Sequence, residues 1–247
     1  MTSSADVAAS WLPVGVVSPT ELARARVEAL NLVQWPVRIA NSYVEREPAA
    51  ERVMLSYRPE RQAFVTRPFC GDLAVEMRLP SLELQFLEQG LPAPHVFDPE
   101  ERSPAEAEAW VLVELLHRKI DRDRFSKALP YEIAGLSTGD ANDYAPVSCR
   151  RGLEELAHWF SNATAVIAAL ARGANESTVV CWPETLELRY RAGDTEAFFF
   201  PGRGDTQGPS FAAGRIGGAK AILTVAELSR ADDPFATARA FMSAALR

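Results

Sequence analysis

Two glutamates lie close to an aromatic ring in the segment 179–190, where Glu184 and Glu187 follow Trp182. A carboxyl group in a partly dry pocket beside such a ring has a raised pKa and can exchange a proton with a substrate near neutral pH. We therefore consider Glu184 and Glu187 as catalytic residues. The competing interpretation, which carries more weight, is that both are solvated charges paired with the arginines that follow them.

The alternation of polar and apolar residues from Thr185 to Tyr190 predicts a strand that displays Glu187 on one face. Aromatic residues of this strand and the next would form apolar walls. An arginine and an aspartate from the following glycine-rich segment would anchor polar groups of a ligand. The expected substrate-binding residues are Trp182, Tyr190, Phe199, Arg203, Asp205, Tyr131 and Glu132.

Other catalytic and metal-binding motifs are missing from the sequence. The histidines His95, His117 and His158 show no HxH or HExxH spacing, so we expect no metal site, and structural roles for the last two. No GxSxG or complete P-loop sequence occurs, which argues against a nucleophile elbow and a nucleotide site. The glycine-rich residues 201–218 are expected to form a flexible surface loop, and no cofactor is expected.

Composition limits the partners that the chain can have. The net charge of −7 argues against nucleic acid, because phosphate binding needs a basic surface, and equally against anionic membranes. Three widely separated cysteines do not predict a disulfide framework. We expect a cytoplasmic protein with a small-molecule ligand, and a homo-oligomer is left open.

Helix signals recur along the chain. Ser18 and Ser103 each precede a proline and stand three residues before a glutamate, which is the pattern of a capping box at a helix start. Pro36 should break or bend the first helix, and the helix after Ser103 should be buried on all sides near its centre. Apolar residues at spacings of three and four predict a helix from Arg150 to Ala171, ended by Gly173.

Strand signals fill most of the remainder. Four short strands are expected within residues 52–57, 62–66, 73–79 and 82–87, as an antiparallel meander followed by a connector over 89–102. Residues 196–200 should form another strand, 219–228 a strand or helix, and a last helix should begin at Asp233. The whole predicts an α+β fold in which an antiparallel sheet packs against four or five helices. We expect one domain, with sub-lobes at 1–148 and 149–247 as an alternative.

Several short motifs resemble an uncharacterised bacterial family that carries the sequence Cys-Trp-Pro-His-His-Phe-Asp. The likeness runs from about Trp35 to the C-terminus. Glu184 and Thr185 occupy the positions of the two histidines here, and Glu187 that of the aspartate. The resemblance implies that the scaffold is retained while the polar site, suited to a metal or to acid–base chemistry, is rebuilt or lost. The matching motifs are Leu73 to Leu87, Trp110, Leu129-Pro130-Tyr131, Leu156 to Ala163 and Cys181-Trp182-Pro183.

These patterns favour a metal-free enzyme of the isomerase or cyclase type, acting by acid–base catalysis on a largely apolar molecule in a cavity between sheet and helices. One alternative is a non-catalytic binding or assembly protein whose glycine-rich loop contacts a partner. Another is a hydrolase with a divalent metal held by carboxylates. The sequence leaves open whether the protein is an enzyme at all.

Overall fold

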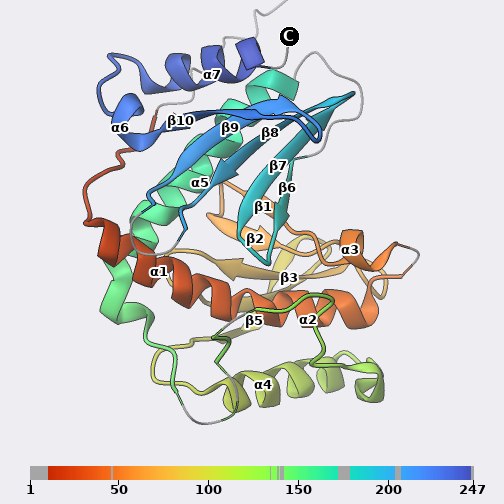
Figure 1. The fold of residues 1–247 in the computed structure, drawn as a ribbon. Coiled ribbons are helices and arrows are strands. Elements are labelled where there is room, and N and C mark those ends of the chain that lie inside the picture. Colours follow the sequence, from red (N-terminus) through yellow and green to blue (C-terminus); the bar gives the residue numbers. More distant parts are fainter. Residues whose placement is uncertain are drawn as a thin grey trace, which may run out of the picture.

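The computed structural model describes residues 11–45, 47–133, 135–137, 139, 142–171, 179–203 and 207–245. Within these residues, two antiparallel sheets of five strands each combine with helices (Figure 1). This confirms the predicted α+β class and the packing of antiparallel strands against helices. The strands divide between an N-terminal sheet and a C-terminal sheet, whereas the sequence predicted one sheet.

The N-terminal sheet is a meander in which each strand pairs with the next, as the sequence predicted for its first four strands. The predicted connector over 89–102 is wrong in part, because residues 91–97 form a fifth strand. This strand contains two prolines, which an edge strand tolerates because one side of it makes no ladder hydrogen bonds. The strands are β1 Ser56–Arg58, β2 Ala63–Val65, β3 Leu73–Arg78, β4 Leu84–Glu88 and β5 Leu91–Phe97.

The C-terminal sheet repeats this simple connectivity in the second half of the chain. The strand expected from Thr185 begins at Glu187, because residues 183–186 form the turn of a hairpin and Leu186 has a φ of 58°. The surface loop expected over 201–218 is wrong for residues 210–215, which form a buried strand of mostly small residues. The strands are β6 Val180–Trp182, β7 Glu187–Ala192, β8 Thr195–Phe200, β9 Ser210–Arg215 and β10 Lys220–Thr224.

The helices begin where the capping signals predict. The Ser18 side chain accepts a hydrogen bond from the Glu21 N–H, and Ser103 forms a reciprocal capping box with Glu106. The predicted end at Gly173 lies outside the described residues. The helices are α1 Pro19–Leu32, α2 Gln34–Tyr43, α3 Ala49–Arg52, α4 Pro104–His117, α5 Arg150–Ala171, α6 Val225–Leu228 and α7 Pro234–Ala245, with short 3-10 helices η1 Arg122–Arg124 and η2 Pro146–Cys149.

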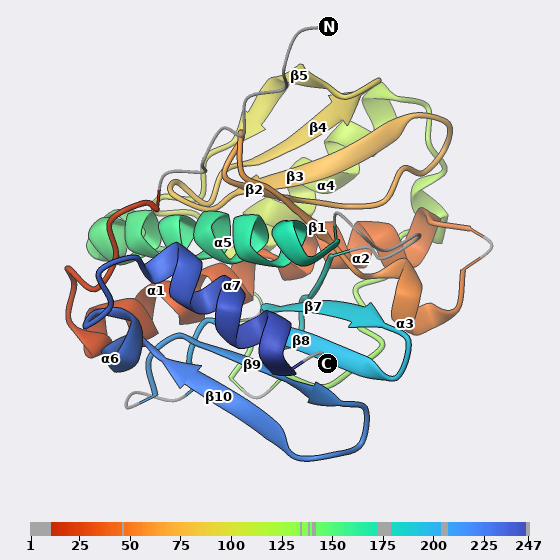
Figure 2. The same ribbon diagram turned by 90° about the horizontal axis from the view of Figure 1, so that it is seen from above.

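Helix α5 runs between the two sheets, with α1 and α7 beside it (Figure 2). The crossing of α1 and α5 is close at Gly152, where an added Cβ would lie 2.8 Å from the Glu21 carbonyl oxygen. Further along α5, Trp159 and Phe160 pack against Phe199 of the C-terminal sheet, and Phe160 also contacts Phe64 of the N-terminal sheet. One continuous apolar cluster therefore joins both sheets through this helix. The division into one domain or two sub-lobes stays a prediction.

Helix α4 lies on the N-terminal sheet, where Trp110 contacts Phe86 and Phe97. The expectation that its centre is buried on all sides is wrong. Val113 and Leu116 are exposed, whereas the opposite side of the helix buries Val111. The helix thus has one inner face, and both of its ends lie near polar side chains that are described below.

Candidate functional site

Of the two glutamates that the sequence analysis proposed as catalytic, Glu187 is the one in a hydrogen-bonded network. It is buried, and its two oxygens accept from different arginines: Oε2 from Arg189 at 2.8 Å and Oε1 from Arg203 at 3.1 Å. The Arg189 guanidinium also lies 4.0 Å from the centre of the Trp182 ring. Both oxygens of Glu187 therefore already accept charge-assisted hydrogen bonds, so this carboxylate is the centre of an ion-pair network.

Glu184 lies apart from this network, exposed in the turn between β6 and β7. Tyr190 and Phe199 face α5 in the apolar core, so they line none of the cavities described here. Glu132 is exposed as well, and Asp205 lies outside the described residues. The structure thus brings together Trp182, Glu187 and Arg203 but separates the other expected site residues.

Arg203 and Phe200 line a cavity of about 730 Å³ between α1, α5 and the C-terminal sheet. The carboxylate in its wall, Glu155, accepts hydrogen bonds from the backbone N–H groups of Gly15, Val16 and Val17 at 2.7 to 2.8 Å. These bonds fix the segment before α1 onto α5. The Glu155 carboxylate of this cavity is therefore occupied by structural contacts.

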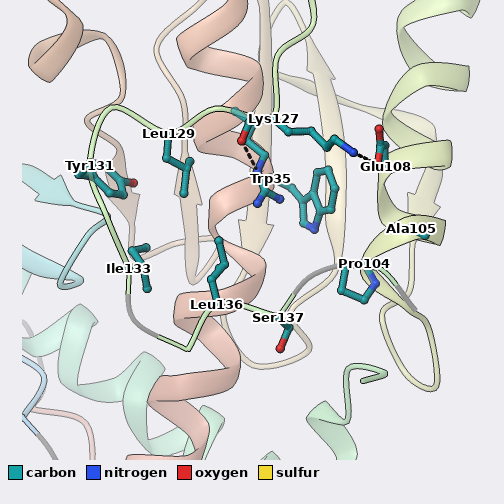
Figure 3. A pocket seen from close by; sticks show the side chains of 12 residues that line it. Trp35, Pro104, Ala105, Glu108, Lys127, Leu129, Tyr131, Ile133, Leu136 and Ser137 are labelled. Atoms are coloured by element: carbon teal, nitrogen blue, oxygen red, sulfur yellow. Dashed lines mark hydrogen bonds and ion pairs between the residues drawn. The ribbon is translucent and has the colours of Figure 1, made fainter. Parts of the chain in front are cut away.

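A second cavity, of about 390 Å³, lies between α2, the start of α4 and the described residues of the loop 127–139 (127–133, 135–137 and 139); we call it the α2–α4 pocket. Leu129 and Leu136 project from the loop into the space beside Trp35 (Figure 3). Tyr131 lies on the same loop, which makes it the one expected binding residue that lines this pocket. The wall consists of Trp35, Arg38, Pro104, Ala105, Glu108, Lys127, Leu129, Tyr131, Ile133, Leu136, Ser137 and Gly139.

Arg38 is the most unusual residue of this wall, because it is only 6% exposed. Its Nε donates to the Lys127 carbonyl oxygen at 3.2 Å, and its guanidinium lies 4.4 Å from the centre of the Trp35 ring. Its two terminal nitrogens have no hydrogen-bond partner among the described residues. Burial lowers the pKa of Arg38 from its ordinary value. Neither terminal nitrogen is among the fully buried polar atoms of the described residues that lack a partner, so both reach the pocket, where a ligand or water can satisfy them.

The charges around Arg38 make the α2–α4 pocket positive in a chain of net charge −7. Lys127 forms an ion pair with Glu108 at 2.9 Å, so these two charges offset each other. The first turn of α4 adds the partial positive charge of a helix N-terminus at Pro104 and Ala105. The Glu108 carboxylate also acts on Arg38, but two cations and one carboxylate leave a net positive charge, so the pocket attracts anions.

Side chains of α2 hold the pocket loop in place. Asn41 donates to the Ala128 carbonyl oxygen at 3.1 Å, and the Tyr131 hydroxyl donates to Gln34 Oε1 at 2.9 Å. Gln34 in turn donates to the Pro183 carbonyl oxygen at 3.1 Å, which connects this loop to the β6–β7 turn. Burial raises the pKa of Tyr131, so its hydroxyl stays protonated and keeps this hydrogen bond.

No protein-family model, curated protein or solved structure matches the chain. The resemblance to the family with the Cys-Trp-Pro-His-His-Phe-Asp sequence therefore stays a prediction. Within the described residues, no helix combines the length and the apolar character that crossing a bilayer requires.

Proposed function

We propose that the protein binds a small organic anion, a carboxylate on an apolar body, in the α2–α4 pocket. The observation that carries this proposal is the buried guanidinium of Arg38, whose terminal nitrogens lack partners among the described residues. Two parallel N–H donors match the geometry of a carboxylate, and charge-assisted pairs of this kind are strong.

The rest of the pocket suits the apolar part of such a ligand. Leu129, Leu136 and the Trp35 ring offer apolar contact, and a volume of about 390 Å³ lies at the small end of ligand sites in proteins. Because Glu108 is paired with Lys127, the ligand needs a single negative charge to balance Arg38. A monocarboxylate with a ring or a short alkyl chain meets these requirements.

The acid–base enzyme, isomerase or cyclase, stays a hypothesis with less support than binding. Both oxygens of Glu187 are engaged in ion pairs, with Arg189 and Arg203. Glu184 is exposed and has no dry environment that would tune it for catalysis. The assembly protein and the carboxylate-bound metal hydrolase also stay predictions.

The test is a pair of calorimetric titrations with 3-phenylpropionate and its neutral amide. We expect the carboxylate to bind at least tenfold more tightly than the amide, because one charge-assisted hydrogen-bonded pair contributes about 1.5–3 kcal/mol. Arg38→Gln should weaken binding of the carboxylate by a similar factor and leave the affinity for the amide unchanged. Arg203→Gln, in the larger cavity, serves as the control and should bind like the wild type. The proposal would be contradicted if the wild type bound the carboxylate and the amide equally. It would also be contradicted if Arg38→Gln bound the carboxylate as tightly as the wild type does.

A further inference from the structure

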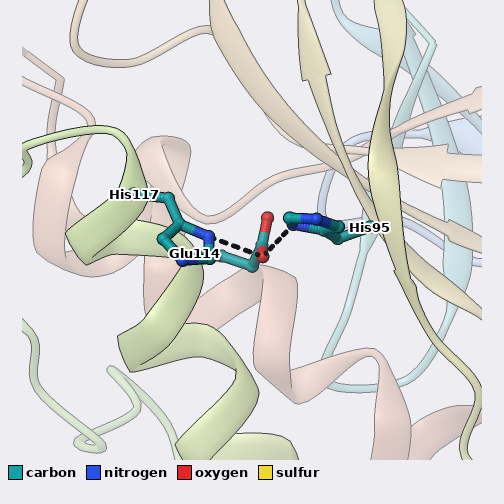
Figure 4. Close-up of side chains that lie close together, drawn as sticks. All are labelled: His95, Glu114 and His117. Atoms are coloured by element: carbon teal, nitrogen blue, oxygen red, sulfur yellow. Dashed lines mark hydrogen bonds and ion pairs between the residues drawn. The ribbon is translucent and has the colours of Figure 1, made fainter.

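Two histidines and a glutamate converge at the other end of α4. His95 of β5 and His117 of α4 both face the carboxylate of Glu114 (Figure 4). His95 Nδ1 lies 3.0 Å from Glu114 Oε1, and His117 Nδ1 lies 3.5 Å from the same oxygen. All three ligand atoms lie within 4.8 Å of one another. Three metal-ligating groups therefore share one small volume.

The burial of these side chains differs in a way that suits an ion entering from solvent. The Glu114 side chain is only 2% exposed, whereas those of His95 and His117 are 57% and 52% exposed. The carboxylate thus has a fixed position at the base of the cluster. The two imidazoles can rotate at its rim to complete a coordination shell.

Arg118 fixes the Glu114 carboxylate by binding its second oxygen. Arg118 Nη1 donates to Glu114 Oε2 at 2.6 Å, and the guanidinium lies 4.4 Å from the centre of the Phe86 ring. Glu88 pairs with Arg118 at 2.9 Å and offsets its positive charge. Oε1 therefore remains directed at the two histidines, in the way that outer hydrogen bonds orient a metal ligand.

The distances in this cluster agree with tetrahedral coordination. Zinc–nitrogen and zinc–oxygen bonds of about 2.0–2.1 Å place two ligands of a tetrahedral ion about 3.3 Å apart. The separations of 3.0 and 3.5 Å between Glu114 Oε1 and the histidine nitrogens bracket this value. An ion could therefore enter with small rotations of His95 and His117.

We propose that His95, Glu114 and His117 bind one divalent transition-metal ion of the zinc class. Two imidazole nitrogens and one carboxylate oxygen form a donor set typical of such ions and unlike the all-oxygen sets of Mg²⁺ or Ca²⁺. The fourth position faces solvent, where a water molecule completes the tetrahedron. The ion would fasten the last turn of α4 to the edge strand β5.

This site is separate from the proposed function. The α2–α4 pocket extends along α4 as far as Glu108, and Glu114 follows six residues later in the same helix. Six residues of α-helix span about 9 Å, so the ion and a ligand at Arg38 occupy different places on the helix. Failure of one proposal leaves the other unaffected.

The test is calorimetric titration of the full chain, without a histidine tag, with ZnCl₂ and separately with MgCl₂. We expect one Zn²⁺ per chain and no saturable Mg²⁺ binding. His95→Ala and His117→Ala should each lower the affinity for Zn²⁺ at least tenfold. Both are half-exposed, so these variants should fold. His158→Asn, which changes the third histidine of the chain, is the control and should bind Zn²⁺ like the wild type.

The proposal is overturned by either of two results. One is the absence of saturable Zn²⁺ binding to the wild type. The other is a Zn²⁺ affinity that is the same in His95→Ala as in the wild type, which would place the ion elsewhere. The visible spectrum of the Co²⁺-loaded protein gives a second readout. We expect a tetrahedral spectrum that is lost in His117→Ala, and an octahedral spectrum would contradict the proposed geometry.

Discussion

Replacing Arg38 by methionine should stabilise the ligand-free protein. The substitution removes one charge-assisted hydrogen bond at 3.2 Å, which contributes about 1.5 kcal/mol, and a cation–π contact with Trp35 of about 1 kcal/mol. It also removes the penalty of several kcal/mol for burying a charge that shares the Glu108 carboxylate with Lys127. Methionine keeps an unbranched apolar stem in the same space. Setting that penalty at about 4 kcal/mol, we expect the free energy of unfolding to rise by roughly 1.5 kcal/mol.

The measurement is urea unfolding followed by far-UV circular dichroism, because Trp35 adjoins the change and makes fluorescence a poor probe. A gain of about 1.5 kcal/mol corresponds to about 3–6 °C in Tm for a chain of this size. Adding 3-phenylpropionate at about 100 times its Kd should stabilise the wild type by about 2.7 kcal/mol and leave Arg38→Met unchanged. The order of the two stabilities should then reverse.

Arg124→Met is the matched control, because Arg124 is half-exposed and forms a surface ion pair with Glu45. Its effect should stay within about 0.5 kcal/mol, with or without the carboxylate. A loss of 1 kcal/mol or more in Arg38→Met without ligand would refute the reasoning. It would mean that the Arg38 guanidinium stabilises the ligand-free fold.

Three further substitutions test the fold. Gly152→Ala should destabilise by about 1–3 kcal/mol in urea, because its Cβ would lie 2.8 Å from the Glu21 carbonyl oxygen at the α1–α5 crossing. Glu187→Gln should lower the free energy of unfolding by about 1–2 kcal/mol in the same assay, because the substitution leaves two arginines with a neutral partner. Burial raises the pKa of the Tyr43 hydroxyl from 10.0 to about 12, so the native state holds this proton more tightly than the unfolded state does. The free energy of unfolding should therefore fall as the pH rises from 10 towards 12. Tyr43→Phe should reduce this alkaline loss.

Each of these predictions has an outcome that contradicts it. A neutral Gly152→Ala would mean that α1 and α5 cross with more space. Glu154→Gln, at an exposed ion pair in α5, should change stability by less than about 0.5 kcal/mol, and an equal loss in both glutamate variants would remove the special role of Glu187. If Tyr43→Phe lost as much stability above pH 10 as the wild type, the alkaline loss of stability would come from other groups.

Local signals in the sequence were sufficient for elements with a clear period or cap. The apolar stripe of α5 and the capping serines of α1 and α4 predicted those helices closely. The signals failed for β5 and β9 for physical reasons. Prolines suggested a connector where an edge strand tolerates them. Glycine and alanine suggested a loop where close packing requires small residues, as at Gly214, whose Cβ would lie 2.7 Å from the carbonyl oxygen of Ala219, the residue before β10.

The candidate pocket could not be predicted from sequence spacing. Arg38 has the sequence context of an ordinary polar residue in a helix, and nothing beside it indicates that the loop 127–139 covers it. Only tertiary packing distinguishes a buried arginine from a solvated one. The same holds for His95, which lies 19 residues before Glu114 in a strand that the sequence did not predict. By contrast, Tyr131 was expected as a binding residue and does line the pocket.

The crystal structure of the protein with bound 3-phenylpropionate tests the central claim most directly. We predict that the carboxylate pairs with both terminal nitrogens of Arg38 and that the phenyl ring lies against Leu129 and Leu136. A carboxylate bound to Arg203 in the larger cavity, or an empty α2–α4 pocket at saturating ligand, would contradict the proposed function.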